Sequence, residues 1–172
     1  MQIARLPDTE QQRLEALAAY EILDTDAEQA FDDLAKLAAQ LCQTPIALIS
    51  LVDPSRQWFK AKVGIEACET SREIAFCAHA ILQNELFEIP DARQDPRFAN
   101  NPLVTGPPHI RFYAGTQLRT PQGHAIGTLC AISNQPKSLS NEQKQGLQSL
   151  GRAVISQMEL RRKLKEIRQI NQ

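Results

Sequence analysis

The stretch from Phe87 to Ile132 constrains the fold more than any other, because a long polar loop lies between short runs that resemble strands. Four prolines fall between residues 96 and 108 of that loop. Its ionisable side chains include Asp91, Arg93, Asp95, Arg97, His109 and Arg111. A loop of this length is uncommon in a compact domain unless it forms a lid or a binding surface. We therefore expect the loop to cover an enclosed site.

The size and charge of the chain indicate one domain without a nucleic-acid or membrane partner. Of its 172 residues, 42% are hydrophobic, which is enough to bury a single core. Nineteen basic and 20 acidic residues leave a net charge of −1, so nothing attracts nucleic acid or an anionic membrane. No apolar run is long enough to span a bilayer, and the first residues lack a signal-peptide pattern. We expect a cytoplasmic protein.

The cysteines indicate neither a disulfide framework nor a zinc ribbon. Cys42, Cys68, Cys77 and Cys130 are scattered along the chain, and none belongs to a Cys-x-x-Cys pair. We expect reduced thiols and no metal site. Cys42 and Cys130 lie in apolar runs and are interpreted as small core residues.

Two helices are predicted before the first strand. Asp8 and Thr9 can cap the first, within an N-terminal helical segment that we assign to residues 1–25. Asp26, followed three residues later by Gln29, is typical of a capping box for the second helix. Apolar residues then recur on one face of this helix until a Thr-Pro pair ends it.

A hairpin of two different strands is predicted next. Residues 46–52 (IALISLV) are almost uninterrupted in hydrophobicity, which predicts a central strand buried on both faces. Residues 57–63 alternate instead, which predicts one buried and one wetter face. The predicted buried face holds Phe59, Ala61 and Val63, and the predicted wetter face holds Trp58, Lys60 and Lys62.

The middle of the chain is predicted to contain a short helix and three further strands. Apolar residues at helical spacing indicate a helix over residues 74–83. The runs LFEIP, RFYAGTQL and AIGTLCAI read as strands, because they are short, apolar and bounded by turn residues. These three runs bring the predicted number of strands to five.

The last helix is predicted from about residue 140 to the end of the chain, and it carries two apolar stripes in succession. The first stripe is expected to pack on the domain, whereas the second has little of this chain left to cover it. A homodimer through this helix is therefore predicted, and the alternative is a solvated helical tail. The first stripe consists of Leu147, Leu150, Val154 and Met158, and the second of Leu160, Leu164 and Ile167. The missing C-terminal cap leads us to expect a fragment of a longer protein.

Several strings, in this order, resemble a GAF domain of the kind found upstream of bacterial histidine kinases and diguanylate cyclases. They are YEILDT, FDDLAKLAAQLC, PIALISLVD, RQWFKAKVG, ETSREIAFCAHAI, IPDARQDPRFANNPLV, HIRFYAG and GTLCAI. The resemblance implies an α+β fold, related to GAF and PAS domains, with a central antiparallel sheet of five to six strands, helices packed on it and a long C-terminal helix. The expected units are the N-terminal segment, a core of residues 26–139, and a signalling and dimerisation helix of residues 140–172.

The resemblance also implies where a ligand would lie, which is between the sheet and the helix and loop that cover it. Arg111 and Tyr113 alternate on one strand and should face the same side. The candidate ligand-binding residues are Cys77, Asp91, Arg97, Phe98, His109, Arg111 and Tyr113. They suit a small anionic or polar ligand. In the alternative, the aspartates and arginines pair with each other and only pin the loop. The sequence identifies no cofactor.

Two other functions within the family depend on Cys77. GAF domains that bind bilins attach them through a cysteine followed directly by histidine, but here Ala78 separates Cys77 from His79. Positions 77 and 79 of a helix point about 200° apart, which argues against a shared ligand. A thiol reductase would need a reactive pair, for which Cys68 and Cys77 are the candidates.

The resemblance therefore favours a sensory or regulatory domain without catalytic activity. It is expected to pass a small-molecule signal through its dimeric terminal helix to an effector domain or kinase. The alternative is a dimerisation scaffold without a ligand, in which Phe76, Phe98 and Tyr113 fill the interior themselves.

Overall fold

The structure describes residues 1–83 and 86–171, and its elements are bounded as follows. The strands are β1 (Ile46–Val52), β2 (Arg56–Val63), β3 (Glu69–Ser71), β4 (Phe87–Ile89), β5 (Phe112–Arg119) and β6 (Ala125–Ser133). The α-helices are α1 (Glu10–Ala18), α2 (Gln29–Cys42), α3 (Phe76–Ala80), α4 (Pro102–Thr105) and α5 (Asn141–Ile170), with 3-10 turns at Arg72–Ile74 and Ala92–Gln94.

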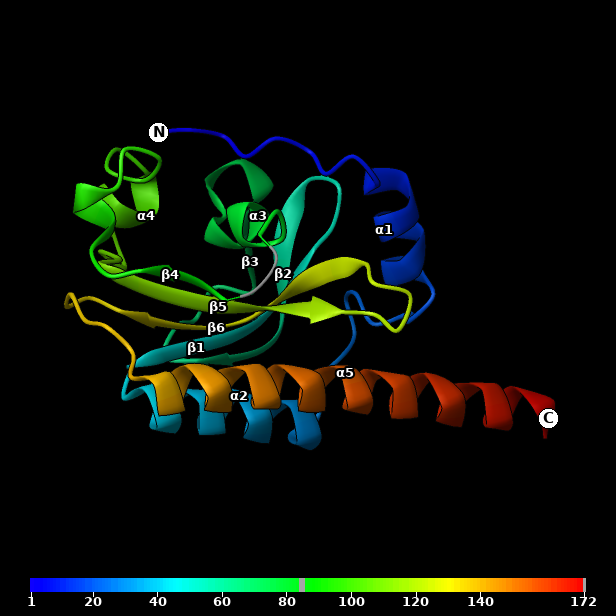
Figure 1. Ribbon diagram of the computed structural model, residues 1–172. Coiled ribbons are helices and arrows are strands. Elements are labelled where there is room, and N and C mark those ends of the chain that lie inside the picture. The colour runs from blue at the N-terminus through cyan, green and yellow to red at the C-terminus, as the bar shows by residue number, and fades with distance from the viewer. Residues whose placement is uncertain (84–85, 172) are drawn as a thin grey trace.

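In this computed structural model the strands form one antiparallel sheet with helices on both faces (Figure 1). The order across the sheet is β3-β2-β1-β6-β5-β4, so β1 and β6 are central. Helices α2 and α5 pack side by side under one face, which we call the helix-covered face. Helices α3 and α4 and their loops lie over the other, the loop-covered face. The predicted fold class is confirmed.

The sixth strand, β3, lies at the edge of the sheet and was not predicted from its own sequence. It pairs antiparallel with the first residues of β2, where Arg56 lies opposite Ser71 and Trp58 opposite Glu69. Its three residues, Glu-Thr-Ser, contain no apolar position, so no periodic pattern marks them as a strand. Pairing with β2 decides their conformation.

The predicted wetter face of β2 is correct for Lys62, which is exposed, but wrong for Trp58 and Lys60, and the strand contains a β-bulge. Ile49 of β1 pairs with Ala61 while the adjacent Ser50 pairs with Phe59, which leaves Lys60 as the extra residue. The bulge turns Phe59 toward the loop-covered face and Ala61 toward the helix-covered face, although the alternation predicts that they share one. Trp58 and Lys60 are both buried.

The start of α2 also differs from the predicted capping box. The helix begins at Gln29, and the residue before it, Glu28, makes no side-chain capping hydrogen bond. The Asp26 carbonyl instead accepts a hydrogen bond from Lys60 Nζ at 2.5 Å. A buried lysine on β2 therefore holds the chain that enters α2.

Helix α3 is shorter than the predicted helix over residues 74–83. A 3-10 turn precedes it, and the Ser71 hydroxyl accepts a hydrogen bond from the Glu73 N–H at the start of that turn. The helical spacing of the apolar residues holds only from Phe76 to Ala80. This pair of short turns places Phe76 and Cys77 directly above the sheet.

Close packing of α5 on the domain depends on two glycines on the helix-covered face. A β-carbon at Gly151 would lie 2.7 Å from the Thr116 side chain of β5, and one at Gly146 would lie 2.7 Å from Leu41 of α2. The buried residues of the predicted first stripe, Leu147, Val154 and Met158, join the main hydrophobic core there. Ser140 and Gln143 form a reciprocal capping box at the start of the helix.

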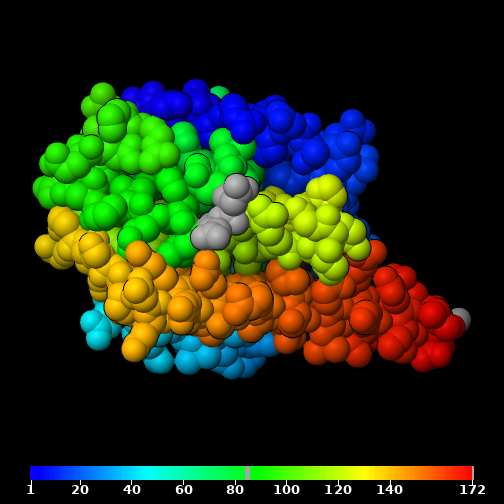
Figure 2. All heavy atoms as spheres, in the orientation of Figure 1, coloured from blue at the N-terminus to red at the C-terminus, as the bar shows by residue number. Residues whose placement is uncertain are grey.

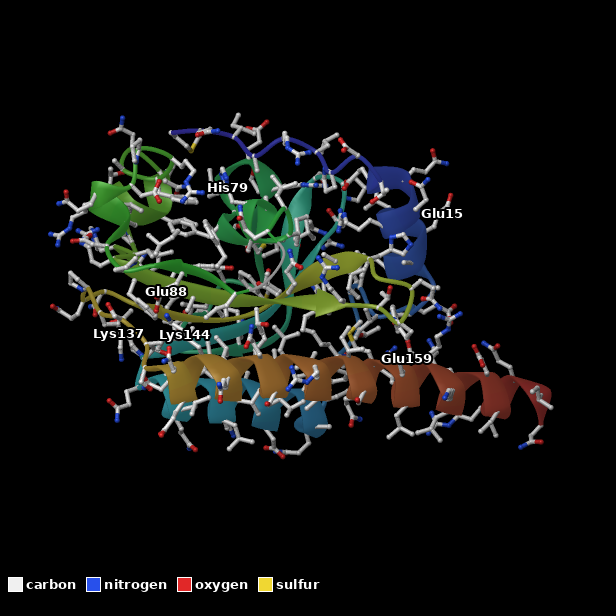
Figure 3. All side chains as sticks on the ribbon, viewed as in Figure 1. Glu15, His79, Glu88, Lys137, Lys144 and Glu159 are labelled. Carbon is white, nitrogen blue, oxygen red and sulfur yellow. The ribbon has the colours of Figure 1, made fainter. Side chains whose placement is uncertain are left out.

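The side chains that fix the start of α5 come partly from β4. Glu88 accepts a hydrogen bond from the Leu139 N–H at 2.8 Å, and Lys144 lies 3.7 Å from the same carboxylate. Figure 3 shows Glu88, Lys137 and Lys144 gathered at this end of the helix. Lys137 Nζ donates to the Cys42 carbonyl at the end of α2. The beginning of α5 is thus tied to both the sheet and α2.

The second half of α5 keeps polar contacts with the domain, but its apolar stripe is uncovered. Leu160, Leu164 and Ile167 are 49%, 43% and 53% exposed, so the second predicted stripe is uncovered in the single chain. Figure 2 shows this part of the helix extending past the body of the domain. None of the helices in the described part of the chain is both long and apolar enough to cross a membrane.

Candidate functional site

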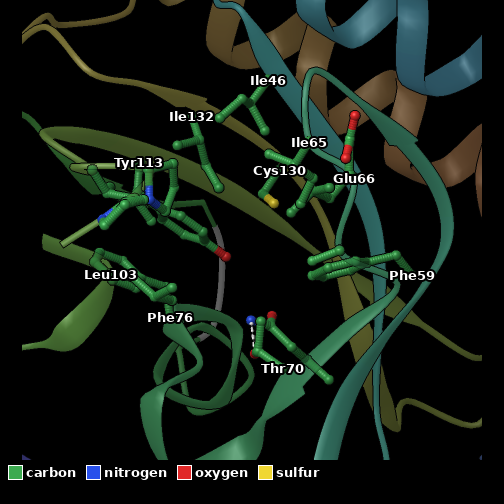
Figure 4. Close-up of a pocket in the computed structure, with 16 residues that line it drawn as sticks. Ile46, Phe59, Ile65, Glu66, Thr70, Phe76, Leu103, Tyr113, Cys130 and Ile132 are labelled. Carbon is green, nitrogen blue, oxygen red and sulfur yellow. Dashed lines mark hydrogen bonds between the residues drawn. The ribbon is translucent and has the colours of Figure 1, made fainter.

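A cavity of about 270 Å³ lies on the loop-covered face, between the sheet and its cover (Figure 4). Its floor is formed by side chains from four strands: Ile46, Leu48, Gln57, Phe59, Tyr113, Cys130 and Ile132. Its cover and rim are Ile65, Glu66, Ala67, Thr70, Phe76, Leu103, Pro107, Pro108 and Ile110. The long proline-rich loop thus contributes to the cover of this cavity, although the cavity is partly open to solvent and not enclosed as the sequence predicts.

Aromatic rings close one side of the cavity. The Phe76 ring stacks on Phe98 with centroids 4.2 Å apart and lies 5.3 Å from the Tyr113 ring. Tyr113 bends over Gly115, where a β-carbon would lie 2.4 Å from the tyrosine hydroxyl. Only glycine at position 115 therefore lets Tyr113 take this orientation.

A polar corner of the cavity is organised around the Gln57 amide. Its Oε1 accepts hydrogen bonds from Ser50 Oγ at 3.0 Å and from Cys77 Sγ at 2.8 Å. Its Nε2 donates to Thr70 Oγ1 at 2.6 Å, a contact drawn as the dashed line beside Thr70 in Figure 4. The Thr70 hydroxyl donates in turn to the Ser71 carbonyl. The orientation of the amide is therefore fixed by donors on one side and an acceptor on the other.

The thiols around the cavity are protonated and buried. Cys77 is 1% exposed, and burial raises its pKa to about 11. Burial also raises the pKa of Cys130, whose sulfur faces the cavity (Figure 4). A nucleophilic or redox-active cysteine needs an accessible thiolate, which neither residue provides. Cys77 acts here as a hydrogen-bond donor to Gln57.

Tyr113 is the one predicted ligand-binding residue that lines the cavity. Phe98 and Cys77 lie one layer behind it, in contact with Phe76 and Gln57. The hypothesis that Phe76, Phe98 and Tyr113 fill the interior describes their packing correctly, but a cavity remains beside them.

The predicted polar residues of the covering loop lie outside the cavity lining. Asp91 pairs with Arg93 at 2.8 Å, and Asp95 pairs with Arg97 at 2.7 Å. These pairs match the alternative in which the loop satisfies its own charges. Arg111 and His109, which lie further along the loop, are also outside the cavity lining.

Arg111 donates to the Val104 carbonyl at 2.9 Å, which holds α4 in place. His109 is exposed and has a left-handed backbone with φ of 57°. Arg97 stacks over Phe87, with 4.9 Å between its guanidinium and the ring centroid. Ligand binding by Asp91, Arg97, His109 and Arg111 stays a prediction, and their observed contacts are structural.

The residues that the sequence analysis missed are the polar ones beneath the lid. Ser50 is a polar residue inside the apolar strand β1, and Gln57 is the second residue of the adjacent strand β2. A buried polar side chain needs a partner, so Ser50 alone was a signal that the loop-covered face contains a hydrogen-bonded group. Thr70 carried no comparable signal, because it lies in the short edge strand.

A second polar chain connects the cavity strand with α5. The Lys60 side chain is 0% exposed, and its Nζ lies 2.6 Å from Glu28 Oε2. Arg161 of α5 donates to the same oxygen at 2.8 Å. Burial alone would raise the pKa of Glu28, but hydrogen bonds from Lys60 and Arg161 outweigh it and lower the pKa. Lys60 directly follows Phe59 of the cavity floor.

The N-terminal segment is fastened over α3. Figure 3 shows His79 beneath this segment, and its Nε2 lies 3.0 Å from the Gln2 carbonyl. Glu10 of α1 lies 2.8 Å from Arg13 and 2.5 Å from Arg72. Burial would raise the pKa of Glu10, but the hydrogen bonds from both arginines lower it to about 2.

Within residues 1–83 and 86–171, histidine, cysteine, aspartate and glutamate form no cluster of three or more that could hold a metal ion. The lining of the cavity is mainly apolar, with one polar corner at Gln57.

A model of the GAF domain family matches residues 26–157. This match covers most of the chain, and together with the sheet, the lid and the cavity it shows that the chain belongs to the GAF domain family.

A curated relative, a cyclic di-GMP phosphodiesterase from Pseudomonas aeruginosa, is 40% identical over 153 residues. The aligned part covers 88% of this chain but 26% of that protein, so this chain spans about a quarter of the relative's length.

Two solved structures illustrate how widely the fold is used. The free methionine-R-sulfoxide reductase from Neisseria meningitidis, in complex with its substrate, has a TM-score of 0.64 at 14% identity, covering 95% of this chain and 99% of that one. The blue-light-absorbing form of the PixJ GAF domain from Thermosynechococcus elongatus has a TM-score of 0.62 at 14% identity, covering 91% and 92%. Because these likenesses show the fold alone, function has to be argued from the site.

Proposed function

We propose that this chain is a non-catalytic sensory and regulatory domain that responds to a small molecule in its cavity and signals through a dimeric α5. The observation that carries the proposal is the chain of contacts from Phe59 through the bulged Lys60 and Glu28 to Arg161. It joins the cavity floor on one face of the sheet to the helix on the other. A ligand that shifts β2 would thereby shift α5.

The absence of catalysis is supported by the chemistry of the site. The thiols beside the cavity have raised pKa values and are inaccessible, so neither bilin attachment nor thiol reduction at Cys77 is favoured. Cys68 is exposed, but Cys77 is bonded to Gln57 and Ser50 and is not available to resolve a disulfide with it. Binding is the activity that the lining supports.

Dimerisation through α5 is supported by the uncovered second stripe. Leu160, Leu164 and Ile167 recur at the i, i+4, i+7 spacing that a partner helix covers in a coiled coil. Charged residues such as Arg162 and Glu166 occupy the flanking positions, where they form an i, i+4 pair. The segment from residue 140 onward would act as the signalling helix, residues 26–139 as the sensory core and residues 1–25 as its cover.

The output of this domain is proposed from the name of the curated relative. Since that protein is named a cyclic di-GMP phosphodiesterase and is about four times as long as the matched part, the partner of this domain is proposed to be an effector domain that makes or degrades cyclic di-GMP. A histidine kinase is the alternative that the resemblance implies. Action in the cytoplasm, without nucleic acid or membrane, agrees with the balanced charge.

The second candidate is a dimerisation scaffold without a ligand, which the aromatic stack of Phe76, Phe98 and Tyr113 favours. Both candidate functions include a dimer, so the experiment that distinguishes them has to detect a bound small molecule. Native mass spectrometry of the freshly purified chain, with a visible spectrum, is the test. A colourless dimer carrying additional mass supports the sensor, and a dimer that never acquires mass from any small molecule supports the scaffold.

A further inference from the structure

The dimensions of the cavity restrict the size of its occupant. An engineered protein cavity of about 150 Å³ accommodates benzene, and ordinary ligand pockets begin near 300 Å³. At about 270 Å³ this cavity fits a compact molecule of roughly one substituted ring or a small bicycle. A dinucleotide or a tetrapyrrole needs far more room.

The charges around the cavity select against anions. Among the described residues that line it, Glu66 at the exposed rim is the one with a charge, and its charge is negative. Two basic residues close in sequence to lining residues have other partners: Lys62 bonds the Glu66 and Ala67 carbonyls, and Arg111 bonds the Val104 carbonyl. An unpaired carboxylate or phosphate in an apolar cavity is strongly disfavoured.

The polar corner selects for a hydrogen-bond acceptor. Both acceptor positions of Gln57 Oε1 are filled by Ser50 and Cys77, and one amide hydrogen is donated to Thr70. A primary amide has two donor hydrogens, so Gln57 retains one for a ligand in the cavity it lines. A carbonyl, ether or hydroxyl oxygen on the ligand would satisfy it.

We propose that the cavity binds a small uncharged molecule with an aromatic or aliphatic ring and one oxygen acceptor, which is bound by the Gln57 amide. This inference rests on the proposed sensory function and specifies its ligand. Cys77 and Ser50 are positioning residues, because they hold the Gln57 oxygen away from the ligand and so present its N–H. Tyr113 and Phe76 provide the ring contacts.

The experiment compares three probes of similar size on the unaltered full chain, which are acetophenone, benzoate and ethylbenzene. Binding is followed by NMR of the methyl groups of Ile46, Leu103 and Ile132, which line the cavity. We expect acetophenone to bind about tenfold more tightly than benzoate, because the anion must be desolvated, and several-fold more tightly than ethylbenzene, which lacks the acceptor.

A variant then tests the role of the amide. Gln57→Leu should remove the preference for acetophenone over ethylbenzene while ethylbenzene still binds. Should this variant fail to fold, Thr70→Val is the second test: it removes the acceptor that orients the amide and should reduce the same preference. A preference for acetophenone that is unchanged in Gln57→Leu, or in Thr70→Val where Gln57→Leu does not fold, would overturn the assignment of Gln57.

Two other outcomes would overturn the proposal in different ways. Benzoate binding as tightly as acetophenone at these methyl groups would refute the uncharged ligand class but leave the sensory function standing. If no probe perturbs the methyl groups and the purified chain never carries a small molecule, both the ligand class and the sensory function fail, and the scaffold is favoured.

Discussion

The two faces of the sheet differ in how closely they are packed, although the same strands form both. On the helix-covered face, Gly151 of α5 packs against Thr116 of β5 and Gly146 against Leu41 of α2, and apolar side chains fill the space. On the loop-covered face, short helices and loops leave a cavity and bury Ser50, Gln57 and Cys77. One face therefore has a filled core, and the other retains free volume and hydrogen-bonding groups that the proposed ligand would use.

The two faces are not independent, because the bulge in β2 belongs to both. Phe59 contributes to the cavity floor, whereas the next residue, Lys60, points to the helix-covered side and binds Glu28. In a regular strand consecutive residues also alternate between faces, but the extra residue lets Lys60 and Ala61 both serve the helix-covered side. This is where a change on one face can reach the other.

Shortening a matched leucine on each face should give the largest difference in stability. Leu129→Ala on β6 opens a void in the filled core, so we expect a loss of roughly 3 to 5 kcal/mol in the free energy of unfolding. Leu48→Ala on β1 enlarges a cavity that already exists and should cost about 2 kcal/mol. Urea unfolding of both variants measures this, and equal losses would contradict the contrast between the faces.

The Glu10 ion pairs predict how the cover of the loop-covered face responds to acid. The pKa of Glu10 lies near 2, below the ordinary 4.5, so its stabilisation is complete above pH 4.5 and is lost as the pH falls toward 2. The shift corresponds to about 3 kcal/mol. Glu10→Gln should lower stability by this order at pH 7 and match the unaltered protein near pH 2.

The measurement is urea unfolding of both proteins across this pH range. Asp53 and Asp95 also have lowered pKa values, but they are present in both proteins, so the difference between the curves isolates Glu10. A difference that does not change between pH 7 and pH 2 would contradict the electrostatic role of Glu10.

A double-mutant cycle on Lys60 and Glu28 sharpens the connection between the faces. Lys60→Met and Glu28→Gln each break the 2.6 Å pair, and their effects should be coupled by about 1 kcal/mol or more. Lys62→Met is the matched control, because Lys62 lies on the same strand and bonds only carbonyls and Cys68 of the next loop. Additive effects of the two substitutions would show that Lys60 and Glu28 are not energetically coupled, which would contradict their proposed role in connecting the two faces.

A charge on the uncovered stripe should have the smallest effect on stability and a large effect on assembly. Leu164→Glu replaces a 43% exposed side chain, so we expect a change under about 0.5 kcal/mol in the unfolding of the monomer. The same change should abolish the proposed dimer. Leu6→Glu is the control, since Leu6 is 59% exposed and belongs to the stretch before α1, which lies on the other side of the sheet from α5 (Figure 1). Sedimentation equilibrium of the unaltered chain and the two variants measures the oligomeric state. If the Leu164→Glu variant still forms a dimer, the interface does not involve this stripe.

The sequence predicted the fold well where elements repeat a pattern. The apolar run of β1, the amphipathic face of α2 and the first stripe of α5 each follow a pattern that burial requires. All of β1 is buried, and the other two are buried apart from the half-buried Leu34, Leu41 and Leu150. The bulge at Lys60 was not predicted. An extra residue changes the face of the sheet to which the β2 side chains point, but the sequence still alternates in the same way. The edge strand β3 was missed because its pairing, not its composition, defines it.

The candidate site was predicted in position but less well in its residues. The long loop and the strand alternation predict the cover and the inward position of Tyr113, whereas Gln57, which also lines the cavity, was not predicted. Sequence alone does not show whether Asp91 and Arg97 face inward or pair with neighbours, because both arrangements use the same residues. Their short-range pairs at i, i+2 become visible only in three dimensions.

The central claim, that the state of the cavity reaches α5 through Lys60 and Glu28, is tested most directly by amide hydrogen exchange. A Cys130→Leu side chain would occupy part of the cavity without depending on the identity of any ligand. We predict that this variant changes exchange in residues 155–168 of α5 as well as around the cavity, and that adding Glu28→Gln confines the change to the loop-covered face. Exchange in α5 that is the same whether the cavity is filled or empty would contradict the account.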